Sequence, residues 1–116
     1  MSKDPQRGEL WWVDWSPGRG SEQQGTRPAL VIQTDAANLN PRYPNIIVVA
    51  VSTKGKPVPF HVAVKPTIQN GLGELSYIKC EQILTISKKR LTRKIGILET
   101  EFLQQVGKAI TLVLNV

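Results

Sequence analysis

The residues of this 116-residue chain best suited to chemistry gather in one polar loop, residues 20–28, between two apolar stretches. The loop offers a carboxylate, two amides, hydroxyls and a guanidinium, carried by Ser21, Glu22, Gln23, Gln24, Thr26 and Arg27. Arg27 precedes Pro28, which favours extended backbone at Arg27 and so places it at the entrance of a strand. Gly, Ser and Gln also form ordinary hairpin loops, and composition alone leaves that simpler interpretation open.

The rest of the composition limits the reactions that such a loop could serve. His61 is the only histidine, and no His or Cys pair stands at ligand spacing, so we expect no metal site. No nucleophile elbow is present, which argues against a hydrolase with a Ser-His-Asp or Cys-His set. No phosphate-binding glycine loop precedes a helix, so we expect no nucleotide cofactor either. Arginine, lysine, hydroxyl, amide and carboxylate groups remain. This set fits RNA cleavage, in which the 2′-hydroxyl of the substrate is the nucleophile.

RNA cleavage needs groups that stabilise the transition state and groups that move two protons. The Arg27 guanidinium can donate two hydrogen bonds to phosphate oxygens, and Ser52 can donate another. Arginine is too weakly acidic to serve readily as the general acid, so an electrostatic role is favoured for Arg27. Glu22 is the nearest carboxylate in the sequence. It either takes the 2′-hydroxyl proton or orients Arg27.

The charge of the chain favours a polyanionic partner. Fifteen Lys and Arg residues against nine Asp and Glu residues give a net charge of +6, which makes nucleic acid the first candidate. Many small proteins are basic without binding nucleic acid, so charge alone does not decide the matter. The one dense basic cluster, residues 88–90 with Arg93 and Lys94, is either a solvated turn or a phosphate-contacting patch.

Hydrophobic periodicity predicts a mainly β (α+β) fold. Strands are expected in six stretches, with the buried centre of the sheet at 45–51 and a break near Glu81; the stretches are 9–15, 28–32, 45–51, 59–64, 74–79 and 82–86. A loop at 35–45 is expected to carry a short helical turn. Apolar residues at spacings of three and four from 102 to 113 predict an amphipathic helix that begins near Thr100. This order predicts a single domain over residues 1–116, a curled antiparallel sheet or small barrel with a helix on it.

Several isolated side chains have simpler structural interpretations. A lone cysteine, Cys80, excludes a disulfide framework, is expected to be buried, and fits a reducing compartment such as the cytoplasm. No stretch approaches the roughly 18 to 20 apolar residues that a membrane helix needs, so no export or membrane insertion is indicated. Strand alternation predicts that His61 is exposed. Trp11, Trp12 and Trp15 could stack RNA bases, although at least one is expected in a core or a dimer contact.

An ordered series of motifs resembles the MazF/PemK/Kid toxins of bacterial toxin-antitoxin modules. The series covers roughly residues 7–114 and comprises the stretches 7–11, 20–32, 52–53, 59–62, 80–83, 90–91 and 95–98. The resemblance implies an SH3-like barrel of about five to seven antiparallel strands with a C-terminal helix, acting as a homodimer. It implies a metal-independent endoribonuclease that cuts single-stranded RNA at short motifs, leaving 2′,3′-cyclic phosphate and 5′-hydroxyl ends. It also implies an antitoxin whose disordered acidic segment occupies the RNA groove.

The same resemblance implies roles for individual residues. Arg27 and Ser52 stand where the family places its catalytic groups. One branch of the family uses an Arg and an Asp that flank a cysteine, together with a loop histidine; here these positions read Lys79, Glu81 and Ser21, so the histidine is missing. Lys79 and Glu81 either form a second acid-base pair or pair across strands. We predict that RNA contacts the side chains of Gln23, Gln24, Thr26, Thr53, Lys54, Lys56, His61, Lys79, Glu81 and Gln82.

Two other functions remain open for a chain that resembles this family. The same barrel serves toxins that poison DNA gyrase without cutting RNA, so a protein-binding inhibitor is one alternative. A member that binds RNA or antitoxin without cleaving is another. Replacement of Arg27 by alanine separates these, because only the nuclease depends on that guanidinium for toxicity.

Overall fold

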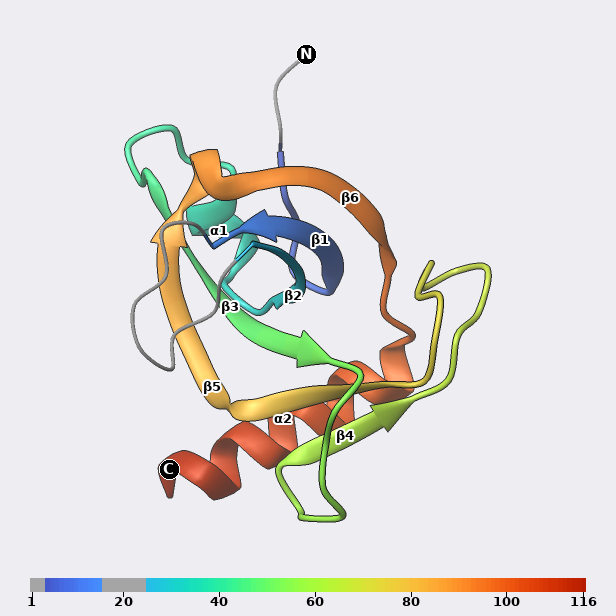
Figure 1. The fold of residues 1–116 in the computed structure, drawn as a ribbon. Helices are drawn as coiled ribbons and strands as arrows, with labels where there is room; N and C mark the ends of the chain where they lie inside the picture. Colours follow the sequence, from blue (N-terminus) through green and yellow to red (C-terminus); the bar gives the residue numbers. More distant parts are fainter. Residues whose placement is uncertain (1–3, 16–24) are drawn as a thin grey trace.

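A computed structural model describes residues 4–15 and 25–116 (Figure 1). One antiparallel sheet has the strand order β4-β5-β3-β2-β1-β6. Its strands are β1 (Glu9–Asp14), β2 (Thr26–Val31), β3 (Asn45–Ser52), β4 (His61–Val64), β5 (Ser76–Ser87) and β6 (Leu91–Ile97). The helical segments are α1 (Asp35–Asn38), the 3-10 turn η1 (Lys88–Arg90) and α2 (Thr100–Leu114). The predicted mainly β fold with a C-terminal helix is confirmed.

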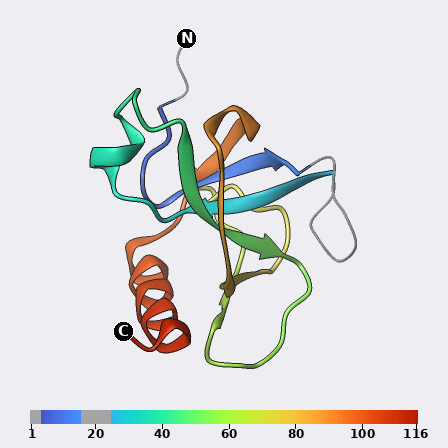
Figure 2. The ribbon, with the colours of Figure 1, turned by 90° about the vertical axis from the view of Figure 1, so that its left-hand side faces the viewer.

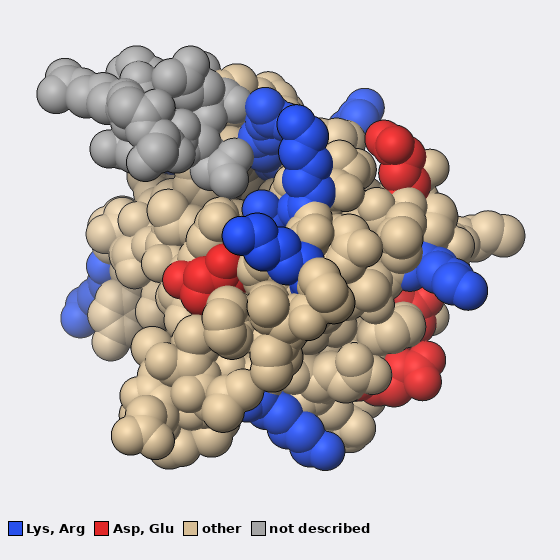
Figure 3. Space-filling view, turned by 60° about the horizontal axis from the view of Figure 1, so that its bottom comes forward, with Lys and Arg blue, Asp and Glu red and all other residues tan. Residues whose placement is uncertain are grey.

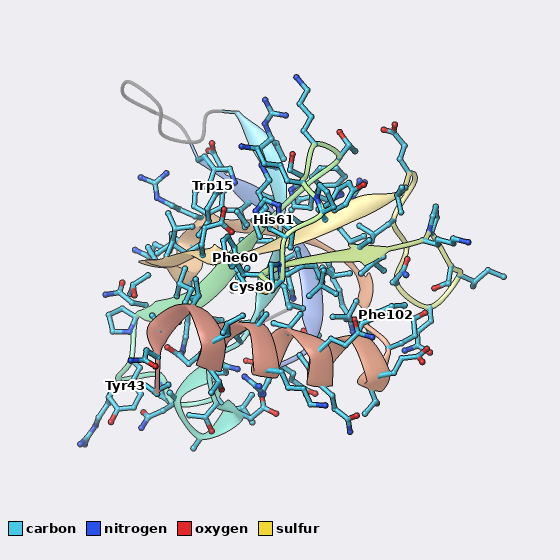
Figure 4. All side chains as sticks on the ribbon, turned by 90° about the horizontal axis from the view of Figure 1, so that it is seen from below. Trp15, Tyr43, Phe60, His61, Cys80 and Phe102 are labelled. Atoms are coloured by element: carbon cyan, nitrogen blue, oxygen red, sulfur yellow. The ribbon has the colours of Figure 1, made fainter. Side chains whose placement is uncertain are left out.

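The sheet curls into a barrel, and α2 packs against β4 and β5 at one end of it (Figures 1 and 2). β3 lies inside the sheet between β5 and β2, and most of its side chains are buried, as its apolar sequence predicts. Val106 and Ala109 bring the apolar face of α2 into a core shared with Leu10, Leu30 and Ile78. Phe102 lies partly buried against this core near the start of α2 (Figure 4). A second core contains Trp11, Val13, Trp15, Val31 and Ile46, among other residues.

β5 is one long strand, where the sequence predicted two stretches with a break near Glu81. The break is a change of register, because Val49 pairs with Ile83 while the next residue, Ala50, pairs with Lys79. Residues 80–82 are therefore extra on β5. Such a bulge bends a strand and increases its twist, which lets β5 turn a corner of the barrel and also pair with β4.

Two helical elements agree with the sequence. α1 occupies the expected helical turn in the loop after β2. α2 begins at Thr100, as predicted, and its N-cap is Glu99. The Glu99 carbonyl accepts from the backbone N–H groups of Phe102 and Leu103, while its carboxylate binds Thr67 and Asn70 in another loop. Contacts with a distant loop therefore hold the residue that caps α2. Among the described residues, no helix is long and apolar enough to cross a membrane.

β6 forms an edge of the sheet beside β1 and carries much of the basic cluster. Lys94 forms an ion pair of 2.9 Å with Glu9, whose carboxylate also accepts from the Trp11 indole. Arg90 Nη1 donates to the Asp14 carbonyl at 2.9 Å. Lys88 Nζ donates to three carbonyl oxygens at the end of α1 and just beyond it, those of Ala37, Asn38 and Asn40. These three basic side chains therefore bind the protein itself, which favours a structural turn over a phosphate-contacting patch.

Replacing Lys88 with methionine is expected to lower the free energy of unfolding by about 1–2 kcal/mol, because three carbonyls lose a charged donor. Urea denaturation measures the difference. Lys89→Met is the matched control, since Lys89 is exposed and its backbone N–H, not its ammonium, binds Ser87. Equal stabilities of the two variants would show that the Lys88 contacts contribute nothing.

Candidate active site

A pocket of about 590 Å³ lies where several strand ends meet. Its walls come from β1, the start of β2, the end of β3, the chain before β5 and one residue of β6. The lining residues are Trp12, Thr26, Arg27, Pro28, Val51, Ser52, Thr53, Lys54, Gly71, Leu72, Gly73, Glu74, Ser76 and Ile95. Five of the residues predicted from sequence to act on RNA are among them.

Strand pairing explains why Arg27 and Ser52 meet although 25 positions separate them. β2 and β3 are antiparallel, with Ala29 opposite Ala50. The same register, extended by two residues, brings Arg27 opposite Ser52. Arg27 is exposed, as a residue at a strand entrance should be. The backbone therefore presents a guanidinium and a hydroxyl on one wall of the pocket.

The Ser52 hydroxyl has a defined local partner. Its Oγ accepts a hydrogen bond from the backbone N–H of Lys54 at 3.1 Å. Because this bond uses a lone pair of Oγ, the hydroxyl proton can still be donated to another acceptor. Arg27, Lys54 and Ser52 thus supply two positive charges and a hydroxyl donor around one pocket, an arrangement that suits a phosphate group.

The other described residues predicted to contact RNA do not line this pocket. They are Lys56, His61, Lys79, Glu81 and Gln82, and they belong to the β3–β4 connection, β4 and the bulged part of β5. Glu22, Gln23 and Gln24 lie outside the described residues and stay predictions. On the face of the molecule that Figure 3 shows, several Lys and Arg side chains gather near the upper middle.

The expected exposure of His61 is wrong. Its side chain is only 6 % exposed, and both ring nitrogens have partners. Nδ1 accepts from the Lys56 backbone N–H at 3.0 Å, and Nε2 lies 2.9 Å from a carboxylate oxygen of Glu81. Because Nδ1 accepts, the neutral ring carries its proton on Nε2 and donates it to Glu81. Phe60 packs edge-on against His61, with 5.7 Å between ring centroids (Figure 4).

The Glu81 carboxylate is stabilised in its charged form. Burial raises its pKa, but the hydrogen bond from His61, a hydrogen bond from the backbone of Glu81 itself and the charge of Lys79 outweigh burial and hold the pKa below the usual 4.5. The side chain is 34 % exposed, so solvent reaches it. Glu81 therefore pairs across strands with His61 on β4. Because it is charged and reached by solvent, its carboxylate could also accept a proton.

Replacing Glu81 with glutamine is expected to reduce the amount by which the free energy of unfolding falls as the pH is lowered. A carboxylate whose pKa is lowered by folding contributes stability above pH 4.5, and this contribution is lost as the pH falls through the folded-state pKa. The wild-type protein should therefore lose more stability than the variant below about pH 4.5. Urea denaturation across a pH series measures the slopes, and exposed Glu101→Gln is the control. Parallel wild-type and Glu81→Gln curves would contradict the expectation.

Cys80 and two of the tryptophans are buried, whereas the third tryptophan lines the pocket. Cys80 is fully buried, as expected, and burial together with the Glu81 charge raises the pKa of its thiol to about 11. Trp11 and Trp15 are core residues, each 7 % exposed, so neither can stack a base. Trp12 points to the other face of β1 and lines the pocket.

Among the pocket residues that were not predicted from the sequence are Leu72, Gly73, Glu74 and Ser76. The Gly71-Leu72-Gly73 run signals only a turn, and nothing in it indicates that the turn folds back toward Arg27. Among the described residues, no group of three or more His, Cys, Asp or Glu side chains is placed to hold a metal ion.

Comparison with known proteins identifies similar chains. A family model described as PemK-like, MazF-like toxin of type II toxin-antitoxin system matches residues 6–114. The chain is 43 % identical over 108 residues to Endoribonuclease EndoA of Bacillus subtilis (strain 168), which covers 90 % of this chain and 89 % of that protein. A crystal structure of MazF from Deinococcus radiodurans superposes with a TM-score of 0.81 at 24 % identity, covering 99 % of this chain and 100 % of that chain. A mycobacterial endoribonuclease in complex with its cognate antitoxin gives 0.79 at 20 % identity, covering 97 % and 96 %. These two structures support the fold.

Proposed function

Because the chain belongs to the PemK-like, MazF-like toxin family of type II toxin-antitoxin systems, we propose that it is a toxin that cleaves single-stranded RNA. We propose a sequence-specific, ribosome-independent endoribonuclease that needs no metal. The observation that carries the proposal is the convergence of Arg27, Ser52 and Lys54 on one pocket. The 43 % identical relative is named an endoribonuclease, which supports the same activity.

In the proposed reaction, the 2′-hydroxyl of the RNA attacks the adjacent phosphorus and the 5′-oxygen leaves. The products are a 2′,3′-cyclic phosphate and a 5′-hydroxyl. Arg27 donates hydrogen bonds to the phosphate oxygens and stabilises the charge of the pentacovalent transition state, while the Ser52 hydroxyl adds a further donor. Glu22 or Glu81 accepts the 2′-hydroxyl proton. His61 holds Glu81 through the hydrogen bond between them, so in this mechanism His61 acts by positioning that carboxylate.

The proposed RNA path extends beyond the pocket. Thr26, Thr53 and Lys54 contact RNA at the pocket itself. Lys56, Lys79 and Gln82 continue the path toward the β4–β5 side. The net charge of +6 favours this polyanion.

We propose three further properties with this activity. The protein acts in the cytoplasm and forms a homodimer. A cognate antitoxin inhibits it by laying a disordered acidic segment over the basic RNA path. A solved mycobacterial endoribonuclease is in complex with its cognate antitoxin, and the positive charge of this chain suits an acidic partner.

The test is incubation of the purified protein with a long single-stranded RNA in EDTA, followed by mapping of fragment ends and their chemistry. Cleavage at a recurring short motif with cyclic phosphate ends is expected. Absence of cleavage by the folded, antitoxin-free protein would overturn the proposal. Inhibition of DNA gyrase by that same preparation would then assign the protein to the gyrase-poisoning toxins.

A further inference from the structure

Besides its cationic residues, the pocket around Arg27 is lined by one acidic residue and one tryptophan. One wall of the pocket is formed by Arg27 and Pro28 on β2 and by Ser52 on β3. Ser52 pairs with Tyr77 on β5, so the chain just before β5 continues this wall. There it carries Glu74, the one acidic residue among those that line the pocket. On the other side of β2, Trp12 pairs with Pro28 and lines the pocket too.

We propose that Trp12 and Glu74 form a guanine-binding subsite beside the catalytic Arg27. Trp12 would stack on the base, and the Glu74 carboxylate would accept hydrogen bonds from its Watson–Crick edge. The inference rests on the proposed function for its substrate, RNA. It assigns to the pocket a base preference that neither the motifs nor the family match specifies.

The case for stacking comes from the position of Trp12. Trp12 is half-buried, whereas Trp11 on the same strand and Trp15 just after it are core residues. Among the described contacts, the Trp12 indole makes no hydrogen bond that would keep it from facing a ligand. Apolar neighbours complete that part of the wall, namely Pro28, Val51, Leu72 and Ile95. An aromatic ring in an apolar wall next to cationic groups is the arrangement by which single-stranded nucleic acid is bound.

The case for Glu74 comes from the rigidity of the loop that presents it. Ser76 Oγ donates to the Glu74 carbonyl at 3.0 Å and fixes the backbone there. Upstream, the Asn70 side chain is fully buried and binds four groups. Gly71 has φ +70°, and a Cβ there would collide with the Ile95 carbonyl, so this loop packs directly against β6. A wall held in this way is organised before the ligand arrives.

The chemistry of a lone carboxylate selects the base. Glu74 repels phosphates, so the group beside it should be a base edge that donates hydrogen bonds. Guanine carries N1–H and N2–H side by side, which match the two oxygens of a carboxylate. Adenine and cytosine place a ring acceptor next to their amino group, and uracil places its single N–H between two carbonyls. Guanine is therefore the base that Glu74 accepts best.

The test measures binding of uncleavable probes, so that it does not depend on catalysis. The probes are 2′-O-methyl oligouridines of about six nucleotides with one central guanine, hypoxanthine, adenine or cytosine. Hypoxanthine differs from guanine only by the missing N2 amino group. Wild-type protein should bind the guanine probe about tenfold more tightly than the hypoxanthine probe, as expected for one charge-assisted hydrogen bond.

Two variants and one control complete the design. In Glu74→Gln the guanine preference should fall below about threefold, whereas Glu101→Gln, an equal change of charge on exposed α2, should keep it. Trp12→Leu should weaken all probes by about tenfold without changing their order, because stacking does not distinguish bases. The RNA cleavage assay in EDTA is run on the same preparations.

The outcomes separate the two proposals. Cleavage of RNA by a wild-type protein without guanine preference, or with a preference that Glu74→Gln retains, overturns the subsite and leaves the nuclease standing. A Glu74-dependent guanine preference in a protein that cuts no RNA supports the subsite and overturns the proposed function.

Discussion

The Arg27→Ala variant is expected to cleave RNA at least about 10³-fold more slowly than the wild-type protein. The guanidinium is placed opposite Ser52 at the pocket and can donate two hydrogen bonds to the phosphate. Those bonds strengthen as charge develops on the phosphate in the transition state, so their loss lowers the rate of the chemical step. Single-turnover cleavage of a defined single-stranded RNA in EDTA measures the effect.

The controls separate charge from geometry and from folding. Arg27→Lys keeps the charge but not the two-pronged donor, so it should recover only part of the rate. Arg93→Ala removes an exposed arginine from β6, outside the residues that line the pocket, and should cleave at nearly the wild-type rate. Unfolding midpoints should agree among all four proteins, since Arg27 is exposed. An Arg27→Ala protein within tenfold of wild type would remove this residue from the mechanism.

The Asn70→Ala variant is expected to lower the free energy of unfolding by about 3 kcal/mol. The Asn70 side chain is 0 % exposed and satisfies four groups at 3.0–3.2 Å. It donates to the Lys65 carbonyl and the Glu99 carboxylate, and it accepts from the backbone N–H groups of Thr67 and Leu72. Alanine leaves these four part-buried groups without the partner that the fold provides. Thermal and urea unfolding measure the loss.

Asn70→Asp separates shape from hydrogen bonding at the same position. Aspartate keeps the acceptor for the two N–H groups but places a negative charge next to Glu99 and removes both donors, so it should destabilise at least as much as alanine. Gln69→Ala is the control, since Gln69 is exposed and adjacent. The loop also carries the pocket wall at Leu72 and Glu74, so guanine binding should weaken in the Asn70 variants. A change below about 1 kcal/mol in Asn70→Ala would contradict this account of the loop.

Much of the fold follows from local patterns. The apolar run 45–51 predicts a buried central strand because it has no polar face, and β3 is that strand. The spacing of Val106, Ala109 and their neighbours predicts α2 because it places apolar groups on one helical face. β6 lacks such a pattern. It is an edge strand with mostly exposed residues, and pairing with β1 rather than hydropathy makes it a strand.

The candidate site was predictable only in part. Arg27 and Ser52 stood out by residue type, by their places at strand ends and by the resemblance of the surrounding motifs, and the structure puts both on one pocket. Glu74 and the other residues before β5 carried no such signal. Their place in the pocket depends on the contacts of Asn70 and Gly71, which bind residues far away in the sequence.

The sequence by itself determined the strand-rich fold, the helix and the residue types available for chemistry, because these depend on composition and short-range periodicity. The tertiary structure decided which partner each polar group has. His61 is buried against Glu81 because the bulge at 80–82 changes the register of β5, and Lys88 binds carbonyls about 50 residues away in the sequence. Such contacts form only when distant segments of the chain pack together. Local propensity is set within a few residues along the chain. It carries no information about which distant carbonyl or carboxylate folding will bring near a given side chain.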